Sequence, residues 1–481
     1  MDLPLSPLLT DLYQLNMAYG YFKLGMHDRP AVFHHFFRRP PFAGGFTMTA
    51  GLESLIDFLK SYRFTETDLS YLKSLALFDD KFLNYLKILK ITLDIDAMPE
   101  GSIVFPSEPI VRVTGPLLQA QLLETTLLNL LNFPTLIATK AARVTLAAKG
   151  DKTVEFGLRR AQGIDGAMTA SRAAFVGGIN ATSNVLAGKA YGIPVQGTQA
   201  HSWVLAFEEE LESFMALKEV CQDKLTLLVD TFDTHEGVRN AIQVGKQLKK
   251  EGRELFAIRL DSGDLAALSI WARNELDAAG MQSTQILASN ELDEWIISDL
   301  KSQGAKIDAW GVGTRLVTGG NQGALEGVYK LSAIQNEKGK WDYRFKLSEQ
   351  LHKISNPGFL QVRRYYKDKK PIADLIYDEW TTLEEQPILC DLVDPTKTKK
   401  LSKTLTSVDL LQPIFRAGEC VYTSPPLQEI QKTGKNNLAE FPSEIKRFIN
   451  PDLYLVGFEK NYHEHRLSLI RDIRSKRMEM A

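Results

Sequence analysis

The sequence has only three cysteines among its 481 residues, and Cys221, Cys390 and Cys420 lie far apart. No CxxC pair and no cluster of cysteine with histidine is present, so the pattern predicts neither a zinc site nor a disulfide framework. We expect three reduced thiols in a cytoplasmic protein. The segment up to Tyr13 lacks a basic start followed by an apolar core, and we therefore expect no signal peptide.

Long apolar runs and a strong charge of either sign are also missing. The most apolar region, Pro116–Leu136, is interrupted by Gln, Glu, Asn and Pro residues, which is typical of buried helix rather than of a membrane span. The 57 Lys and Arg residues nearly balance the 59 Asp and Glu residues, and the net charge is -2. This balance argues against a protein dedicated to nucleic acid or to a membrane surface.

Four common catalytic or nucleotide-binding motifs are absent. The chain has no GxxxxGK[ST] phosphate loop and no GxGxxG opening a βαβ unit, which excludes a P-loop and argues against a dinucleotide-binding Rossmann site. It also has no GxSxG and no HExxH. What remains is an ordinary soluble composition, 44% hydrophobic and 24% charged, in a chain long enough for two or three domains.

A regular alternation of short apolar strands and helices begins at Thr153 and continues to Lys330. A repeat of roughly thirty residues with short links indicates right-handed βαβ units. Polar, Gly-rich loops follow one strand after another, which favours a barrel over an open doubly wound sheet. The chain before this region is mixed α and β, and the chain after it is β-like and then helical.

Outside the alternating region the pattern predicts an amphipathic helix over Leu9–Gly25, with Thr10 as its N-cap. The basic segment Lys397–Lys403 is predicted to be a loop, and Leu331–Arg364 to form β-hairpins. Further helices are predicted over Thr65–Lys87 (broken near Phe78), Pro116–Asn132, Leu136–Gly150, Gly166–Tyr191 and Phe441–Ser475.

The stretch Phe256–Asp264 is the centre of the predicted site. Its apolar run, Leu255–Leu260, has the pattern of a buried strand and leads directly into Asp261-Ser262-Gly263-Asp264. A capped helix start, with Ser262 or Asp264 as the N-cap, accounts equally well for this stretch alone. The recurrence of polar groups at other strand ends favours a site: Arg159, Arg160, Thr198, His201, Ser202, Asp230, Asp233, Arg259, Asp261, Asp264, Asn290 and Gly311–Thr314.

These groups suit a phosphate ester and a divalent cation. Gly311–Thr314 follows a late strand, where backbone N–H groups and a hydroxyl bind phosphate in many barrels, although a simple turn also fits this tetrapeptide. Arginines bind phosphate or carboxylate in bidentate pairs, and acids hold Mg²⁺ beside substrate phosphates. His201, among arginines and acids, suits an acid, a base or a nucleophile, but a lone histidine is more often structural.

At these residues the chain closely resembles the nicotinate phosphoribosyltransferase family, over nearly its whole length. Members join nicotinate to 5-phosphoribosyl 1-pyrophosphate, giving nicotinate mononucleotide and pyrophosphate, and couple the reaction to ATP hydrolysis. The motifs that carry the resemblance are LLTDLY (8–13), FFRR (36–39), FGLRRAQG (156–163), GTQAHS (197–202), LDSGD (260–264), GVGT (311–314) and GVYKL (327–331).

The resemblance implies an irregular α/β barrel over residues 140–330 that carries the active site. It also implies an N-terminal α/β sandwich domain over 1–139, joined by segments after 330, and a C-terminal extension over 331–481. The expected assembly is a cytoplasmic homodimer whose active sites are completed across the interface. The expected cofactor is Mg²⁺, with ATP as a co-substrate.

By the same resemblance, His201 is the residue that ATP phosphorylates, and Asp261 and Asp264 lie near the ribose and the metal. Tyr13 of the neighbouring subunit is expected to stack on the pyridine ring. The other expected substrate contacts are Thr198 and Arg259 for nicotinate, Gly313 and Thr314 for the 5-phosphate, and Arg160, Ser202 and Gly311 beside them; Arg38 and Arg39 match without an assigned role.

The choice between acid and amide is predicted from one stretch. The related nicotinamide enzymes carry a Gly-Thr-Asp-Thr stretch whose carboxylate meets the amide, and the corresponding region here, Gly178–Thr182, lacks an acid. Because an aspartate there would repel a carboxylate substrate, its absence favours nicotinate.

Three other interpretations remain open from the sequence. A barrel lyase or isomerase acting on a sugar phosphate needs a lysine or glutamate base, and no convincing one stands at a strand end. Leu227–Gly237 loosely resembles the acidic loop of the Rossmann-like phosphoribosyltransferases, but Asp230 and Asp233 are three residues apart rather than adjacent. A catalytically dead metabolite sensor on the same fold is disfavoured by the presence of His201 and Asp261.

Overall fold

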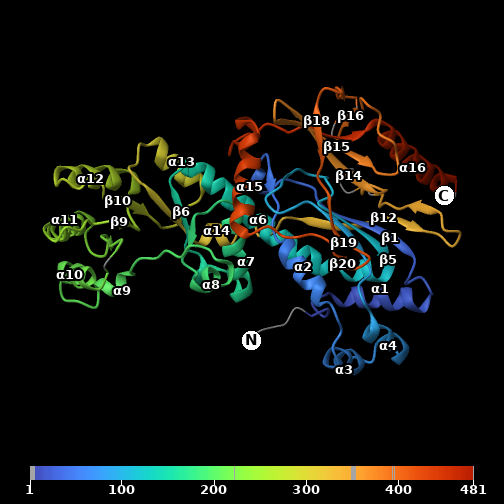
Figure 1. Ribbon diagram of the computed structural model, residues 1–481, viewed down its shortest axis with the longest axis horizontal. Coiled ribbons are helices and arrows are strands. Elements are labelled where there is room, and N and C mark those ends of the chain that lie inside the picture. Colours follow the sequence, from blue (N-terminus) through green and yellow to red (C-terminus); the bar gives the residue numbers. More distant parts are fainter. Residues whose placement is uncertain (1–5, 222, 348–353, 393, 395, 480–481) are drawn as a thin grey trace. The chain divides into compact units, whose positions relative to one another are not determined.

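The structure is a computed structural model that describes residues 6–221, 223–347, 354–392, 394 and 396–479 (Figure 1). The chain divides into two compact units. Leu136–Gly323 forms one of them, here called the central unit, and Met1–Thr135 together with Ala324–Ala481 forms the other, here called the terminal unit. The limits predicted for the barrel were 140 and 330.

The central unit is built on one sheet of six parallel strands in the order β7-β6-β11-β10-β9-β8. Each strand is short and mostly buried, as expected for a parallel sheet that is covered on both faces. The strands are β6 (Lys152–Glu155), β7 (Ala181–Thr182), β8 (Thr226–Leu228), β9 (Ala257–Leu260), β10 (Gln285–Ala288) and β11 (Ala309–Val312).

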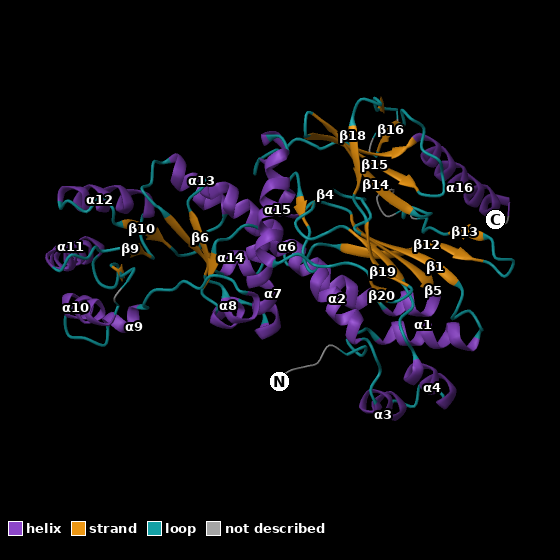
Figure 2. Cartoon of the chain, in the orientation of Figure 1, coloured by secondary structure: helices purple, strands orange, loops and turns teal. Residues whose placement is uncertain are grey.

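Helices connect these strands, and Figure 2 shows them arranged around the sheet. The alternation confirms the predicted α/β class. Within the described chain no backbone pairing joins β7 to β8, so closure into a barrel stays a prediction. The helices are η2 (Leu158–Arg160), α7 (Gly163–Val176), α8 (Val185–Tyr191), α9 (His201–Val204), α10 (Glu210–Val220), α11 (Thr234–Lys250), α12 (Leu265–Ala278), α13 (Glu294–Ser302) and α14 (Thr314–Val317).

The single helix predicted over Gly166–Tyr191 is wrong, because the structure breaks it into α7, β7 and α8. Gly178 has a φ of +104°, a left-handed conformation that ends α7 and that glycine adopts readily. Strand β7 then pairs with β6, and the side chain of Asn184 accepts a hydrogen bond from Ala187 N to begin α8.

The terminal unit contains a seven-stranded antiparallel sheet in the order β13-β12-β1-β5-β3-β19-β20. Strands far apart in the sequence lie side by side in it, notably β1 between β5 and β12 (Figure 1). Its strands are β1 (Pro30–Phe37), β3 (Asp94–Ala97), β5 (Val111–Pro116), β12 (Gly327–Gln335), β13 (Trp341–Tyr343), β19 (Gln412–Arg416) and β20 (Glu419–Cys420).

A six-stranded sheet in the order β17-β16-β21-β15-β14-β18 comes from the C-terminal segment, and a short pair, β2 (Thr47–Met48) and β4 (Ile103–Val104), completes the strands described in this unit. The predicted hairpins of 331–364 are confirmed in outline, except that residues 348–353 lie outside the described chain. The six strands are β14 (Leu360–Lys367), β15 (Lys370–Asp378), β16 (Ile388–Asp391), β17 (Thr398–Lys400), β18 (Thr406–Asp409) and β21 (Val456–Glu459).

Two predictions for the C-terminal segment are corrected. Phe441–Ser475 was predicted to be helical, but β21 precedes the helix there and pairs with β15 and β16. Its glycine, Gly457, allows this close pairing, since a Cβ would lie 2.3 Å from Leu389 Cδ2. Lys397–Lys403 was predicted to be a loop, but it contains β17, an edge strand whose exposed lysines disfavour pairing with another chain.

The helices of the terminal unit include α1, which begins at Leu12 rather than at the predicted Leu9, with Asp11 rather than Thr10 as its N-cap. The break predicted near Phe78 is confirmed between α3 and α4. The helices are α1 (Leu12–Lys23), η1 (Pro41–Ala43), α2 (Leu52–Ser61), α3 (Glu66–Ser74), α4 (Asp80–Ile88), α5 (Leu117–Leu122), α15 (Leu427–Glu440), η4 (Ser443–Lys446) and α16 (Lys460–Glu479).

Helix α6 (Glu124–Ala148) is continuous where two helices divided near Pro134 were predicted. A proline inside a helix removes one backbone hydrogen bond, here the one to Leu130 O. The backbone of Gly51 approaches this carbonyl so closely that a Cβ would lie 2.1 Å from it. Tertiary packing therefore overrides the proline. Among the described residues no helix is long and apolar enough to cross a membrane.

Two buried histidines on β1 are expected to make the terminal unit sensitive to acid. Burial, reinforced by the charge of Arg112, lowers the pKa of His34 to about 3. Burial lowers the pKa of His35 to about 4, although the hydrogen bond with Asn132 by itself raises this pKa. Histidine in the unfolded chain titrates near pH 6.5. The stability that the two neutral rings give the folded protein is therefore fully present above that pH and is lost as the pH falls towards 4 and then 3.

Between pH 7 and pH 5, each histidine is expected to lower the free energy of unfolding by about 2 kcal/mol. Urea denaturation at the two pH values measures this loss. His34 Nε2 accepts a hydrogen bond from Leu360 N at 3.2 Å, and the variant His34→Gln keeps an acceptor there. This variant should lose only about half as much unfolding free energy between pH 7 and pH 5 as the wild type. An unchanged pH dependence in this variant contradicts the assignment.

Candidate active site

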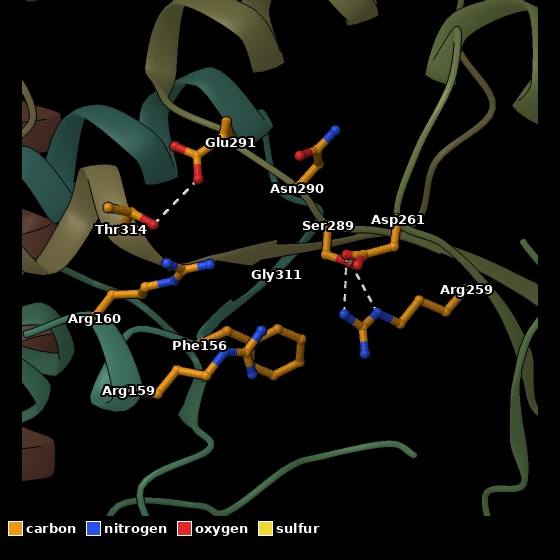
Figure 3. A pocket seen from close by; sticks show the side chains of 11 residues that line it. Phe156, Arg159, Arg160, Arg259, Asp261, Ser289, Asn290, Glu291, Gly311 and Thr314 are labelled. Carbon is orange, nitrogen blue, oxygen red and sulfur yellow. Dashed lines mark hydrogen bonds and ion pairs between the residues drawn. The ribbon is translucent and has the colours of Figure 1, made fainter. Parts of the chain in front are cut away.

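The predicted polar groups of the central unit gather at the carboxyl edge of its sheet. Because the six strands are parallel, their carboxyl ends lie along one edge. Two cavities of about 120 Å³ and about 180 Å³ open there. They share four lining residues, Phe156, Arg159, Arg259 and Asp261. Figure 3 shows the smaller one, here called the first cavity.

Arg259 is the cation at the centre of this edge. It lies inside β9, and its side chain is 11% exposed. Its Nε donates to Ser289 Oγ at 2.8 Å, its Nη1 to Thr198 Oγ1 at 2.9 Å and its Nη2 to Asp261 Oδ1 at 2.9 Å. The guanidinium lies 5.6 Å from the centre of the Phe156 ring. These contacts hold a buried cation in one orientation in the wall of both cavities.

Asp261 connects Arg259 with His201. Its Oδ1 accepts hydrogen bonds from Arg259 and from Ser289 Oγ, and its Oδ2 lies 3.7 Å from His201 Nε2. Burial raises the pKa of Asp261, but the Ser289 hydrogen bond and the positive charge of Arg259 outweigh burial and hold this pKa below its usual value. Asp261 is therefore a carboxylate at neutral pH.

Asp230, at the end of the neighbouring strand β8, supports the Asp261 loop. Its Oδ2 accepts from Asp261 N at 2.8 Å and from Ser262 Oγ at 2.6 Å. Its Oδ1 is buried and has no hydrogen-bond partner in the described part of the chain. The sequence placed Asp230 among the strand-end groups that favour a site, although the resemblance gave it no role. Its unsatisfied oxygen indicates a ligand position, since buried polar atoms are otherwise paired.

The donor set fits Mg²⁺ only if the substrate completes it. No group of three or more His, Cys, Asp or Glu residues suited to a metal occurs among the described residues. Asp230 Oδ1 and Asp261 Oδ2, however, are carboxylate oxygens that accept no hydrogen bond from the described residues. Mg²⁺ is commonly held by one or two carboxylates together with substrate phosphates, and these two oxygens suit that arrangement.

Asp264, the other predicted metal ligand, is the N-cap of α12. Its Oδ1 accepts from Ala266 N at 3.1 Å and from Ala267 N at 3.0 Å, and Gly263 makes the turn with a φ of +76°. It does not line either of the two cavities. The two interpretations of this stretch therefore both apply: Asp264 caps the helix, while Asp261 faces the cavities. A metal role for Asp264 stays a prediction.

His201 lines the larger cavity, here called the second cavity, and is the first residue of α9. Its Nδ1 lies 3.2 Å from Thr231 Oγ1, and its side chain is 41% exposed. The ring is thus oriented on one side and accessible on the other. Thr198 lines the same cavity, whereas Ser202 is exposed and lines neither cavity.

The predicted phosphate loop lines the first cavity with Gly311, Gly313 and Thr314, and Figure 3 shows Thr314 near Arg160, across the cavity from Arg259. Gly311 is required for close packing, since a Cβ there would lie 2.6 Å from the Phe156 ring. Thr314 Oγ1 donates to Glu291 Oε1 at 3.3 Å. The three arginines of this cavity, Arg159, Arg160 and Arg259, make it suitable for anions.

The sequence missed Phe156, Ser289 and Glu291 as lining residues of the first cavity, whereas Asn290 was among the predicted strand-end groups. Phe156 and Ser289 follow directly from strands β6 and β10, so their positions at strand ends were a usable signal. Asn290 adopts a φ of +118°, a conformation that non-glycine residues rarely adopt and that is often found at functional sites. Nothing in the local sequence predicted that strain.

No residue of Gly178–Thr182, the stretch predicted to distinguish acid from amide, lines either of the two cavities. Asn180 lies at the amino end of β6, where its Oδ1 accepts from Thr153 N at 2.9 Å. Ser183, just after β7, lines the second cavity together with Arg259. Ser183 is uncharged, and the role of this region in the choice of nicotinate stays a prediction.

Tyr13, Arg38 and Arg39 belong to the terminal unit. Tyr13 lies in the first turn of α1 and is 49% exposed. Its approach to a nicotinate bound by another subunit stays a prediction.

Family models match three successive parts of the chain. The nicotinate phosphoribosyltransferase (NAPRTase) N-terminal domain matches residues 8–132, the nicotinate phosphoribosyltransferase (NAPRTase) family matches residues 152–343, and the nicotinate phosphoribosyltransferase C-terminal domain matches residues 361–466. The predicted motifs at Tyr13, His201 and Asp261 lie inside the first two matches.

Individual relatives match over almost the whole chain. The nicotinate phosphoribosyltransferase of Bacillus subtilis (strain 168) is 42% identical over 474 residues, which cover 98% of this chain and 96% of the relative. That of Homo sapiens is 33% identical over 515 residues, covering 94% of each chain. The crystal structure of human nicotinic acid phosphoribosyltransferase has a TM-score of 0.84 at 29% identity, covering 96% of this chain and 99% of that one.

Proposed function

The chain belongs to the nicotinate phosphoribosyltransferase family, and from this premise we propose that the carboxyl edge of its central sheet transfers a phosphoribosyl group to nicotinate. The donor is 5-phosphoribosyl 1-pyrophosphate, and the products are nicotinate mononucleotide and pyrophosphate, the first step of NAD salvage from nicotinate. The observation that carries the proposal is the Arg259–Asp261–Ser289 cluster, set in the wall that the two cavities share.

The two cavities suit the two substrates. The first cavity joins Arg159 and Arg160 to the Gly311–Thr314 loop, and we assign to it the phosphates of the donor. The second cavity joins Arg259 to the Thr198 hydroxyl, and we assign to it the nicotinate carboxylate. Arg259 and Asp261 line both cavities, so the reacting atoms would meet beside them.

The reaction breaks the bond between the anomeric carbon of the ribose and pyrophosphate, and forms a bond from that carbon to the nicotinate ring nitrogen. Positive charge builds on the ribose ring as pyrophosphate leaves. The Asp261 carboxylate, kept ionised by Arg259 and Ser289, stabilises that charge, and the arginines of the first cavity stabilise the leaving group. Mg²⁺, when bound at Asp230 and Asp261, would neutralise charge on pyrophosphate.

ATP coupling is assigned to His201. The γ-phosphoryl group of ATP moves to a ring nitrogen, ADP leaves, and water later hydrolyses the phosphohistidine to inorganic phosphate. Thr231 orients the ring, and the exposure of the side chain admits a nucleotide. A phosphoryl group on this histidine adds negative charge beside Asp261 and Arg259, which would change substrate affinity or pyrophosphate release.

We further propose a cytoplasmic homodimer with shared active sites. Four large apolar side chains are exposed within nine residues of the N-terminal segment, which is typical of a surface covered by another chain. They are Leu9 (46%), Leu12 (47%), Tyr13 (49%) and Met17 (38%).

Product identity tests the proposed reaction. Purified protein is incubated with Mg²⁺, ATP, 5-phosphoribosyl 1-pyrophosphate and either nicotinate or nicotinamide, and the mononucleotides are separated by chromatography. Nicotinate mononucleotide in the first mixture alone is the expected result. The lack of product with either base contradicts the proposal and favours a metabolite sensor.

Ser183→Asp is expected to weaken the use of nicotinate. The new carboxylate would face the cavity of Arg259 and repel the nicotinate carboxylate, raising the KM for nicotinate about ten- to a hundredfold. Steady-state kinetics measures this rise, and Ser183→Asn, which adds similar volume without charge, is the control. Equal effects of the two substitutions contradict the electrostatic explanation.

A further inference from the structure

A polar cluster at the beginning of α6 holds the segment that carries Tyr13. Side chains of three consecutive residues each bind a different position of this segment. Gln14 Nε2 donates to Glu124 Oε2 at 3.1 Å, Thr125 Oγ1 donates to Asp11 Oδ2 at 2.8 Å, and Thr126 Oγ1 donates to Leu9 O at 2.5 Å.

Gln121 closes the cluster from α5. Its Nε2 donates to Gln14 Oε1 at 2.6 Å and to Glu124 Oε2 at 3.0 Å. Glu124 also lies 3.6 Å from Lys330 Nζ, and its side chain is 16% exposed. Lys330 belongs to the GVYKL motif, which the proposed catalytic site does not use. We call Gln121, Glu124, Thr125 and Thr126 the Glu124 clamp.

The clamp fixes how the first turn of α1 presents Tyr13. Gln14 is 0% exposed and points into the clamp, whereas its neighbour Tyr13 is 49% exposed. Successive residues of a helix point about 100° apart, so fixing Gln14 also fixes the direction of Tyr13. Asp11, the N-cap, makes no capping bond with its side chain and bonds Thr125 instead. The Asp11 side chain therefore makes a tertiary hydrogen bond in place of a local capping hydrogen bond.

We propose that Glu124 and Thr125 are positioning residues that hold Tyr13 in the orientation needed to stack on the nicotinate of the neighbouring subunit. This inference rests on the proposed function and its homodimer with shared active sites, together with the prediction that Tyr13 of one subunit stacks on the nicotinate of the other. Tyr13 is itself 49% exposed, so without the clamp binding would have to pay the entropy of ordering its ring. The burial of Gln14 and Glu124 by itself accounts only for a contribution to stability. An effect of the clamp on the KM for nicotinate distinguishes a positioning role from a purely structural one.

The test compares Thr125→Val and Glu124→Gln with the wild type in steady-state kinetics. Thr125→Val removes one partly exposed hydrogen bond at nearly constant volume, so it should fold even if Glu124→Gln does not. The expected result is a KM for nicotinate raised about three- to tenfold, with kcat unchanged and a melting temperature within about 2 °C of the wild type. Thr404→Val, which changes an exposed threonine hydroxyl elsewhere in the terminal unit, should leave the KM unchanged.

A Tyr13→Ala background separates positioning from stability. If the clamp acts through Tyr13, then Thr125→Val has no further effect on the nicotinate KM of Tyr13→Ala. An unchanged KM in Thr125→Val alone, or the same rise in both backgrounds, overturns the positioning role while leaving the proposed function in place. A wild-type protein that makes no nicotinate mononucleotide overturns the proposed function itself, and with it this inference.

Discussion

Replacing His201 by alanine is expected to abolish ATP-dependent stimulation while leaving a slow ATP-independent transfer of phosphoribosyl to nicotinate. The chemistry at the ribose needs only Asp261, Arg259 and the phosphate loop, and none of these contacts depends on His201. Loss of the imidazole removes the acceptor for the γ-phosphoryl group. Incubation with γ-labelled ATP measures labelling of the protein directly, and the label should be acid-labile.

His235→Ala is the matched control for this experiment. His235 packs against Trp271 with ring centres 4.2 Å apart and planes tilted by 57°, and it lines neither of the two cavities. This variant should keep both the label and the stimulation by ATP. If His201→Ala retains full ATP stimulation or remains labelled, another group accepts the phosphoryl and the assignment to His201 is wrong.

Asp261→Asn is expected to lower kcat about a hundred- to a thousandfold without unfolding the protein. The amide keeps an oxygen for the hydrogen bonds of Arg259 and Ser289, so the local geometry is preserved. The negative charge is lost, and with it the stabilisation of the ribose cation and one oxygen for Mg²⁺. Steady-state kinetics at saturating substrate measures the fall in kcat, and circular dichroism checks the fold.

Asp277→Asn supplies the comparison for Asp261→Asn. Asp277 lies on α12 in an ion pair with Arg273 at 2.8 Å, away from both cavities, and loss of its charge should leave kcat within about twofold of the wild type.

Asp264→Asn tests whether Asp264 is a helix cap alone or also a metal ligand. Asparagine is also a good N-cap, so a purely structural Asp264 tolerates the change, whereas a fall in kcat like that of Asp261→Asn supports the predicted metal role.

The central sheet could be predicted because each signal was local. The apolar run of β9 followed by Asp261, together with similar polar groups at other strand ends, predicts a strand end at the functional edge of an alternating α/β chain. Arg259, Asp261, Thr198 and His201 were placed there from the sequence, and the structure brings them into hydrogen-bonding or ion-pair distance.

The misplaced elements depend on contacts that a local pattern does not contain. Helix α6 continues through Pro134 because Gly51, distant in sequence, packs closely against Leu130 O and the Pro134 ring. Strand β21 forms because β15 and β16 flank it, although its residues fit a helical pattern as well. Asp264 was ambiguous for a different reason, since the same side chain suits a helix cap and a metal ligand, and only its hydrogen bonds show which it makes.

The most direct test of the account is the ratio of ADP to mononucleotide formed in one reaction mixture. The wild type is expected to form nicotinate mononucleotide with matching ADP, and His201→Ala to form mononucleotide without ADP. Mononucleotide formed equally well without ATP by the wild type, or formed from nicotinamide in preference to nicotinate, would contradict the claim that base choice and ATP coupling both reside at the carboxyl edge of the central sheet.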